Sequence, residues 1–522
     1  MSNASSLIRT LIIYSICVPL AIFIGYLMAN PMDYASIFSL VLLGGVLMIP
    51  LFLRWHHFWL IASFNLGAVL FFVPGRPYLW LSLAWVSLLI SIVQYILNPR
   101  LKFLHAPAVT KPLLFLVLVV LVTAKLTGGI GLNSLGSETM GGKKYVFLLS
   151  GVVAYFALIS QRITPKRAYL CFALFFLGSL STMIGELPTL TGQSFSFIYW
   201  VFPVSNTGYR AYFDNGGAIG RLEGLCTAGA AGFNWMLCRY GISELFNLRR
   251  IGRLLLFVCF AVLSLMGGFR SALIGFGVTF AVLFYLEGMM RSRLLPMVLL
   301  VMVLGGSLVI GFSDQMPYSI QRTLSFLPVK VDPAVRESAA ASTEWRVKMW
   351  RDVLPEVPKY LLLGKGYALN AKDMATMHIG SGFEGGMGLE GTEWAGDYHS
   401  GPLSLIIPFG IFGVLAFLWF LFASLGVLYK NYKFGHPAYR NLNRYLMAYF
   451  LVKIFLFFIV FGAFNSDLVT FTALVGLSIS LNGGVAKPVL VSVPQMRLRS
   501  IEMRPAFARP VAVGAHSSST LG

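Results

Sequence analysis

His399 is the side chain best placed for acid–base chemistry. It stands two residues after Asp397, and the apolar stretch that follows begins at Gly401-Pro402, so its ring is expected near a membrane surface. A histidine there can take a proton from a hydroxyl group near neutral pH, because its ordinary pKa is about 6.5. A histidine that only faces solvent would occupy the same kind of position, so both interpretations stay open.

Three arginines near the ends of apolar stretches have the chemistry to hold an anion. Arg270 separates two short apolar stretches, Arg221 directly precedes another, and Arg346 lies in a tryptophan-rich segment. Guanidinium groups stay charged and bind phosphate oxygens in pairs, so three of them on one membrane face suit a lipid-linked diphosphate. An arginine at this depth can also extend to lipid phosphates without holding a specific ligand.

Two further charged residues interrupt the C-terminal apolar stretches. Lys453 lies within the stretch 445–463, where it either forms an ion pair or extends to the interface, and Asp467 marks the outer turn that follows. Ionisable groups at membrane depth are costly and are often functional. We expect Asp467 to be a partner for one of the arginines.

Metal chemistry finds little support in the sequence. The carboxylates of the long polar segment have no HExxH, DxD or EF-hand spacing, and no two of them stand out as a glycosidase pair; they are Glu384, Glu390, Glu393 and Asp397. The five cysteines are an odd number without CxxC spacing, so neither a disulfide framework nor a thiolate metal site is expected. We therefore expect no metal and no cofactor.

The elements that must position these residues are membrane-spanning helices. The 522 residues are 57% hydrophobic and 11% charged, whereas about 25% of residues are charged in soluble proteins. Stretches of about 17–25 apolar residues can cross the bilayer as helices. Candidate stretches are 11–28, 35–53, 58–73, 79–97, 113–130, 145–160, 168–185, 225–241, 254–268, 271–286, 294–312, 402–428, 445–463 and 467–482. Because several are short, the sequence predicts an all-α integral membrane protein with about 12–14 transmembrane helices.

The basic residues indicate the orientation of the chain. If the N-terminus is cytoplasmic, the loops on that side hold most of the lysines and arginines, among them Arg54, Arg100, Arg162, Arg249 and Lys430. This is the positive-inside pattern, and an even number of spans places both termini in the cytoplasm. The net charge of +20 is then explained by the basic loops that orient the chain in the membrane, and no nucleic-acid partner is expected. Only His378 and His399 of the seven histidines face outward in this scheme.

The chain divides into three regions. Residues 1–185 hold the first transmembrane helices, and residues 186–482 form a catalytic membrane core that includes a long outer loop, 313–400. Residues 483–522 are expected to be a disordered cytoplasmic tail, since they lack an apolar period.

The outer loop has two halves of different character. An amphipathic helix is expected from about Ser342 to Leu354, with Ser342 or Thr343 as its N-terminal cap. The second half, Gly380 to Gly396, is rich in glycine and is expected to be mobile. The loop therefore predicts a lid over a site at the membrane surface.

Several short motifs occur in a characteristic order. They are Gly220-Arg221-Leu222-Glu223-Gly224, then Leu265-Met266-Gly267-Gly268-Phe269-Arg270-Ser271-Ala272, then Glu344-Trp345-Arg346 with Trp350, then Leu363-Gly364-Lys365-Gly366-Tyr367, and finally His399 with Ile406-Ile407-Pro408-Phe409-Gly410-Ile411-Phe412-Gly413. Over about residues 200–425 this order resembles the bacterial O-antigen ligase superfamily. Ser400 stands where that family commonly has asparagine, and Phe269 stands where it usually has a small residue.

The resemblance implies a GT-C-like, metal-independent glycosyltransferase of the bacterial inner membrane. Such an enzyme transfers a glycan from undecaprenyl diphosphate to an acceptor hydroxyl on the periplasmic side, in lipopolysaccharide or other surface polysaccharide biosynthesis. It implies that Arg221, Arg270 and Arg346 bind the diphosphate and stabilise it as it leaves, and that His399 acts as general base on the acceptor or orients it.

Three functions stay open at this point. The acceptor is lipid A–core or a similar glycolipid in a ligase, and another lipid-linked repeat unit in a polymerase; protein O-oligosaccharyltransferases share the same core. The number of spans alone would also suit a polysaccharide or lipid transporter, which forms no glycosidic bond.

Overall fold

Helices make up most of the part of the chain that the structure describes. This computed structural model describes residues 2–29, 33–98, 100–130, 141–191, 193–203, 221–368 and 398–488. Nine helices in these ranges are long and apolar enough to cross a membrane, and three shorter apolar helices accompany them, Cys17–Ala29, Ile251–Leu265 and Arg270–Leu286. No strand forms in the described ranges beyond one isolated bridge between Val69 and Tyr78. The expected all-α integral membrane fold is confirmed.

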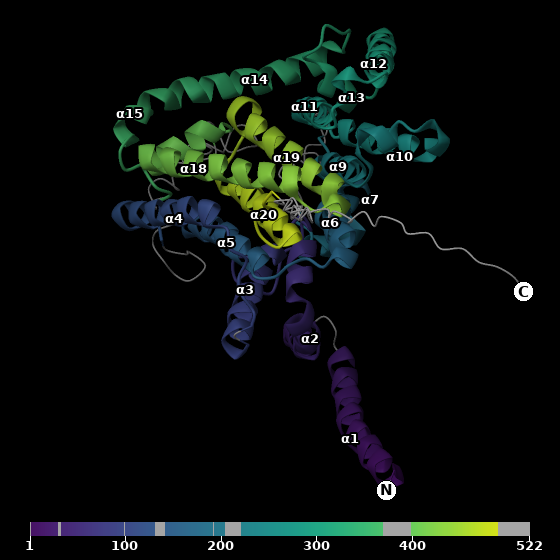
Figure 1. Ribbon diagram of the computed structural model, residues 1–522, viewed down its shortest axis with the longest axis vertical. Coiled ribbons are helices and arrows are strands. Elements are labelled where there is room, and N and C mark those ends of the chain that lie inside the picture. Colours follow the sequence, from purple (N-terminus) through teal and green to yellow (C-terminus); the bar gives the residue numbers. More distant parts are fainter. Residues whose placement is uncertain are drawn as a thin grey trace, which may run out of the picture. The chain divides into compact units, whose positions relative to one another are not determined.

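The long helices pack around an interior rich in phenylalanine. In chain order they are α1 (Ser2–Ala29), α2 (Tyr34–Ser63), α3 (Leu79–Leu97), α4 (Pro107–Thr127), α5 (Gly142–Ile159), α6 (Ala168–Leu177), α9 (Glu223–Leu245), α10 (Ile251–Leu265), α11 (Arg270–Leu286), α12 (Leu294–Gly311), α18 (Gly401–Phe434), α19 (Arg440–Phe455) and α20 (Phe464–Asn482). In space, α4 packs against α18, α5 against α20, and α10 against α9 (Figure 1). Fully buried Phe409, Phe417 and Phe464 join α18 to α20.

The predicted span 58–73 is wrong as a separate helix. Its first residues complete α2, which bends at Trp55, and the helix ends at Ser63. From there the chain runs through turns and irregular backbone, with the Asn65 side-chain amide donating to Phe175 O at 2.7 Å and Val69 N–H donating to Val201 O at 2.8 Å. Asparagine, glycine and proline in this stretch disfavour a helix despite its apolar composition. The other predicted spans each coincide with a helix.

The predicted amphipathic helix of the outer loop is longer than expected. It is α14 (Pro333–Val353), and its cap is Asp332, whose carboxylate accepts from Ala334 N–H at 2.8 Å. The prediction of Ser342 or Thr343 as the cap is therefore wrong, because an aspartate followed by proline at the first helical position is the stronger start signal. In Figure 1, α14 extends between α13 (Tyr318–Leu324) and α15 (Val357–Tyr360). The glycine-rich stretch Gly380 to Gly396, His378 and Asp397 lie outside the described residues.

The Gly-Lys-Gly motif after α15 fastens the outer loop to a break in α18. Lys365 N–H donates to Ile407 O at 2.7 Å and Gly366 N–H donates to Pro408 O at 3.0 Å, where α18 bends at Gly410. Gly364 has a φ of +78°, and a Cβ there would lie 2.1 Å from Pro408 O. Only glycine allows this close approach, so the motif sets where the loop leaves the membrane helices.

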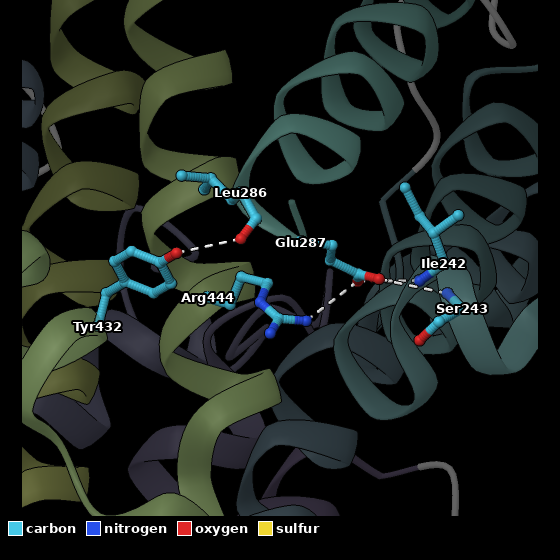
Figure 2. Close-up of polar contacts among 6 residues, drawn as sticks. All are labelled: Ile242, Ser243, Leu286, Glu287, Tyr432 and Arg444. Carbon is cyan, nitrogen blue, oxygen red and sulfur yellow. Dashed lines mark hydrogen bonds and ion pairs between the residues drawn. The ribbon is translucent and has the colours of Figure 1, made fainter. Parts of the chain in front are cut away.

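A buried ion pair joins three helices at the end of α11 that is opposite Arg270. The Glu287 carboxylate lies 3.4 Å from Arg444 and accepts from the N–H groups of Ile242 and Ser243 at 3.0 and 3.2 Å (Figure 2). Breaking such a buried pair typically costs about 3–5 kcal/mol. The pair therefore holds α9, α11 and α19 in one arrangement.

Two details complete this contact. Gly241 has a φ of +68° and interrupts α9, and a Cβ at this position would lie 2.5 Å from the Glu287 carboxylate. The Tyr432 hydroxyl on α18 donates to Leu286 O at 3.0 Å, also shown in Figure 2. Because α11 has 17 residues, the contact lies about 25 Å from the opposite end of the helix, where Arg270 begins it.

Candidate active site

Two arginines from separate segments reach one face of α14, the helix that carries Arg346. Arg270 donates to Ala339 O at 3.0 Å and to Thr343 Oγ1 at 3.1 Å, and Arg221 donates to Ser342 Oγ at 2.8 Å. Positions 339, 342 and 343, together with 338 and 346, share one helix face because of their spacing. The contacts bring Arg270 and Arg221 to the same helix as Arg346.

A fourth arginine at this face, Arg322 on α13, was missed by the sequence analysis. Its side chain is buried and donates to Ser338 O at 3.1 Å and to Ser342 Oγ at 2.9 Å, with a further short contact to Ser338 Oγ. Arg322 stands in none of the motifs that drew attention to the other three. Its one available signal was an arginine in the outer loop close to a span end, which many loop arginines share.

The hairpin between α10 and α11 places Arg270 at the first position of α11. Gly268 has a φ of +77°, and a Cβ on Gly267 would lie 2.4 Å from the Cys226 side chain, so the hairpin needs both glycines. Phe269 provides a surface for Arg221, whose guanidinium lies 5.9 Å from the centre of the ring. This contact gives a physical role to the phenylalanine that departs from the usual motif.

The arginines surround a cavity of about 910 Å³ between α9, α11, α14 and α19. Its charged and titratable lining residues include Arg221, Glu223, Arg270, Arg322, Arg346, His399, Lys453 and Asp467. The predicted site residues that the structure describes therefore all meet in one cavity, although they come from segments far apart in the sequence. Asp397 lies outside the described residues.

Positive charge in this cavity is only partly compensated. Arg270 and Arg322 donate to hydroxyl and carbonyl oxygens, and within the described ranges no carboxylate forms an ion pair with either of them or with Arg346. Burial, followed by the charges of Arg221 and Arg270, lowers the pKa of Arg322 to about 10. All these arginines remain charged at neutral pH, so an anion with more than one negative charge would relieve their mutual repulsion.

Asp467 interacts with a lysine and not with an arginine in the part of the chain that the structure describes. Its carboxylate accepts from Ala463 N–H at 2.9 Å and is close enough to Lys453 for the two charges to attract each other. Lys453 also lies 5.6 Å from the centre of the Tyr449 ring. No carboxylate of the described ranges lies within ion-pair distance of Lys453, so these contacts place the lysine beside Tyr449 and do not make it half of an ion pair.

His399 lies between two aromatic rings beside the arginines. The centres of the Trp345 and Phe461 rings are each 5.2 Å from that of the imidazole, and the Trp350 indole donates to Tyr398 O at 2.9 Å. His399 has a φ of +46°, a conformation that is uncommon for residues other than glycine and that clusters at functional sites. The imidazole therefore stands at the cavity in a position that α14 and the start of α18 hold.

Replacing Arg346 by methionine tests whether the arginines exist for a ligand or for the fold. Burial, followed by the charge of Arg270, lowers the pKa of Arg346, so folding this residue in its charged form costs free energy at neutral pH. Methionine removes this cost and still packs on Phe461. We expect the thermal unfolding temperature of the empty protein to be unchanged or higher, and its increase on addition of undecaprenyl diphosphate to be smaller.

The control for this measurement is Arg351→Met, an exposed arginine on the same helix, which should change neither quantity. A clear drop in the unfolding temperature of the empty Arg346→Met protein would instead assign Arg346 to the fold.

Comparison with known proteins agrees with this arrangement. The family model described as O-antigen ligase matches residues 255–418, a segment that contains Arg270, Arg322, Arg346 and His399. No curated protein matches the chain. The matched segment runs from within α10 through α14 to about the middle of α18. With its apolar helices, the chain is thus an integral membrane protein that is similar, over residues 255–418, to the O-antigen ligase and polymerase superfamily.

Proposed function

We propose that this protein transfers a glycan from undecaprenyl diphosphate to an acceptor hydroxyl. The observation that carries the proposal is the gathering of four arginines around a cavity that also holds His399. A lipid-linked diphosphate brings its negative charge to the membrane interface, where the arginines supply matching positive charge. The imidazole next to them can accept a proton in the same reaction.

In the proposed reaction the acceptor oxygen attacks the anomeric carbon of the donor sugar. The new glycosidic C–O bond forms as the bond between that carbon and the diphosphate oxygen breaks, and the electron pair of the broken bond stays with the diphosphate. His399 takes the proton that the acceptor hydroxyl loses. Arg221, Arg270, Arg322 and Arg346 stabilise the negative charge that develops on the leaving diphosphate, which is the role that a preorganised cationic site performs best.

This chemistry needs no metal ion in our proposal, since the arginines take the place that a divalent cation has in many diphosphate sites. We expect transfer by the purified protein to be undiminished in excess EDTA, measured as new glycosidic product per unit time. Loss of transfer in EDTA, with recovery on adding Mg²⁺ or Mn²⁺, would overturn this part of the proposal.

The closest alternative function is polymerisation by the same site. Cells that lack a ligase accumulate full-length polymer on the lipid carrier, whereas cells that lack a polymerase accumulate single repeat units and lose the surface glycan ladder. Gel analysis of the glycans in a deletion strain separates the two. We favour the ligase because the matched family model is described as O-antigen ligase.

We further propose that the protein lies in the bacterial inner membrane with the cavity on the periplasmic side and both termini in the cytoplasm. The support is the positive-inside distribution of lysine and arginine in the short loops. A His378→Cys substitution in a background without the native cysteines should react with a membrane-impermeant thiol reagent added from the periplasm. Reaction only from the cytoplasmic side would invert this orientation.

A further inference from the structure

One aromatic ring contacts both of the groups to which the proposed reaction assigns different tasks. The centre of the Phe461 ring is 5.8 Å from the Arg346 guanidinium and 5.2 Å from the centre of the His399 imidazole. We infer that Phe461 is a positioning residue, which holds the general base His399 and the diphosphate-binding Arg346 at a set separation. The inference rests on the proposed function and names a residue that neither the motifs nor the matched segment includes.

The backbone before Phe461 is built to place this ring in the cavity. α19 changes at its end into a π-helix, Leu456–Val460, which is a rare conformation associated with functional sites. Phe461 then leaves the helix as extended backbone, and its N–H donates to Leu456 O at 2.9 Å. Because the π-helical turn takes an additional residue, the direction in which residue 461 leaves differs from that of a continued α-helix. Lys453, Leu456, Val460 and Phe461 all line the cavity.

Close packing ties Phe461 to the segment that carries His399. A Cβ on Gly462 would lie 2.9 Å from the Cα of Gly401, and a Cβ on Gly401 would lie 2.2 Å from Phe457 O. The next element is tied in the same way, since Phe464 N–H donates to Ser404 Oγ at 2.9 Å. The neighbours of Phe461 and of His399 therefore touch through glycines, which leaves little freedom for the two rings to move apart.

The ring acts on its two neighbours through different physics. A guanidinium near an aromatic ring is attracted by the negative charge of the ring face, which limits the orientations of Arg346. The imidazole is held between Phe461 and Trp345 by ring packing. An aliphatic side chain of similar size would fill the space and lose the attraction for Arg346 as well as the flat surface against His399.

The test compares Phe461→Leu with Phe461→Tyr in a steady-state transfer assay with a defined lipid-linked donor. Leucine should raise the KM for the donor and lower kcat, each by about three- to tenfold, and tyrosine should restore both. Phe458→Leu is the matched control, because Phe458 lies in the same π-helix and does not line the cavity. If the leucine variant does not fold, Phe461→Met replaces it.

A double-substitution cycle separates positioning from a general structural role. In an Arg346→Met background, Phe461→Leu should no longer raise the KM for the donor, while it should still lower kcat through His399. Wild-type kinetics for Phe461→Leu, or an undiminished KM effect in the Arg346→Met background, would overturn the inference.

The outcome is also separable from failure of the proposed function. If the unsubstituted protein forms no glycosidic bond, the proposed reaction fails first. The claim that Phe461 positions Arg346 is then tested by the thermal stabilisation that undecaprenyl diphosphate gives. Phe461→Leu should reduce this stabilisation and Phe461→Tyr should preserve it. Equal stabilisation of the leucine variant and the unsubstituted protein would overturn it.

Discussion

Replacing Arg270 by alanine is expected to lower the rate of glycan transfer by about two to three orders of magnitude, the range seen when a charge-stabilising donor is removed from an active site. Arg270 starts α11 at the hairpin and reaches α14, so its guanidinium lines the cavity together with those of Arg221 and Arg346. Its contacts are to a carbonyl and a hydroxyl oxygen, so alanine leaves no buried carboxylate without a partner. We therefore expect normal insertion and expression together with lost transfer.

Two further variants sharpen this experiment. Arg270→Lys keeps the charge and loses the paired geometry of the guanidinium, so it should recover only part of the rate. Arg351→Ala removes an exposed arginine from α14 and should leave the rate unchanged. Undiminished transfer by well-expressed Arg270→Ala protein would contradict the assignment of Arg270 to the diphosphate.

Replacing His399 by alanine should reduce transfer by about two to four orders of magnitude, which is the usual contribution of a general base. Undecaprenyl diphosphate should still bind, because the arginines remain. Measured together, a large loss of kcat and an unchanged thermal stabilisation by the lipid diphosphate would separate proton transfer from donor binding.

The backbone of His399 calls for a second variant. Alanine is disfavoured at a φ of +46°, whereas asparagine tolerates this conformation and cannot act as a base. His399→Asn should therefore be as inactive as His399→Ala while the fold is better preserved. Normal transfer by His399→Asn would show that the residue serves the backbone and not the chemistry.

The helices could be predicted because membrane helices are recognisable in a sequence by their length and apolar composition. The failure at 58–73 shows the limit of that signal, since Asn65 and Gly67 end the helix while the apolar composition continues. The start of α14 was misplaced for a different reason. Serine and threonine are residue types that suit a helix cap, but the hydroxyls of Ser342 and Thr343 lie within α14 and accept hydrogen bonds from Arg221 and Arg270. In the structure these two residues contact arginines and do not begin the helix.

Most of the predictable site residues stood in a motif. Arg221, Arg270, Arg346 and His399 did, whereas Asp467 was recognised as a charge next to an apolar stretch, and the structure brings all five to one cavity. Arg322 and Phe461 were not predictable, because their roles arise from contacts with residues distant in the chain, such as Ser338 for the arginine and His399 for the phenylalanine. Such contacts depend on tertiary packing, which no local pattern records.

The most direct test of the central claim is a transfer assay with purified protein, a defined undecaprenyl-diphosphate-linked glycan and a glycolipid acceptor. We predict that mass spectrometry finds the glycan joined to the acceptor by a new glycosidic bond, with undecaprenyl diphosphate released in equal amount. The contradicting result would be an active, reconstituted protein that moves the lipid-linked glycan across the bilayer and leaves its bond to the diphosphate intact.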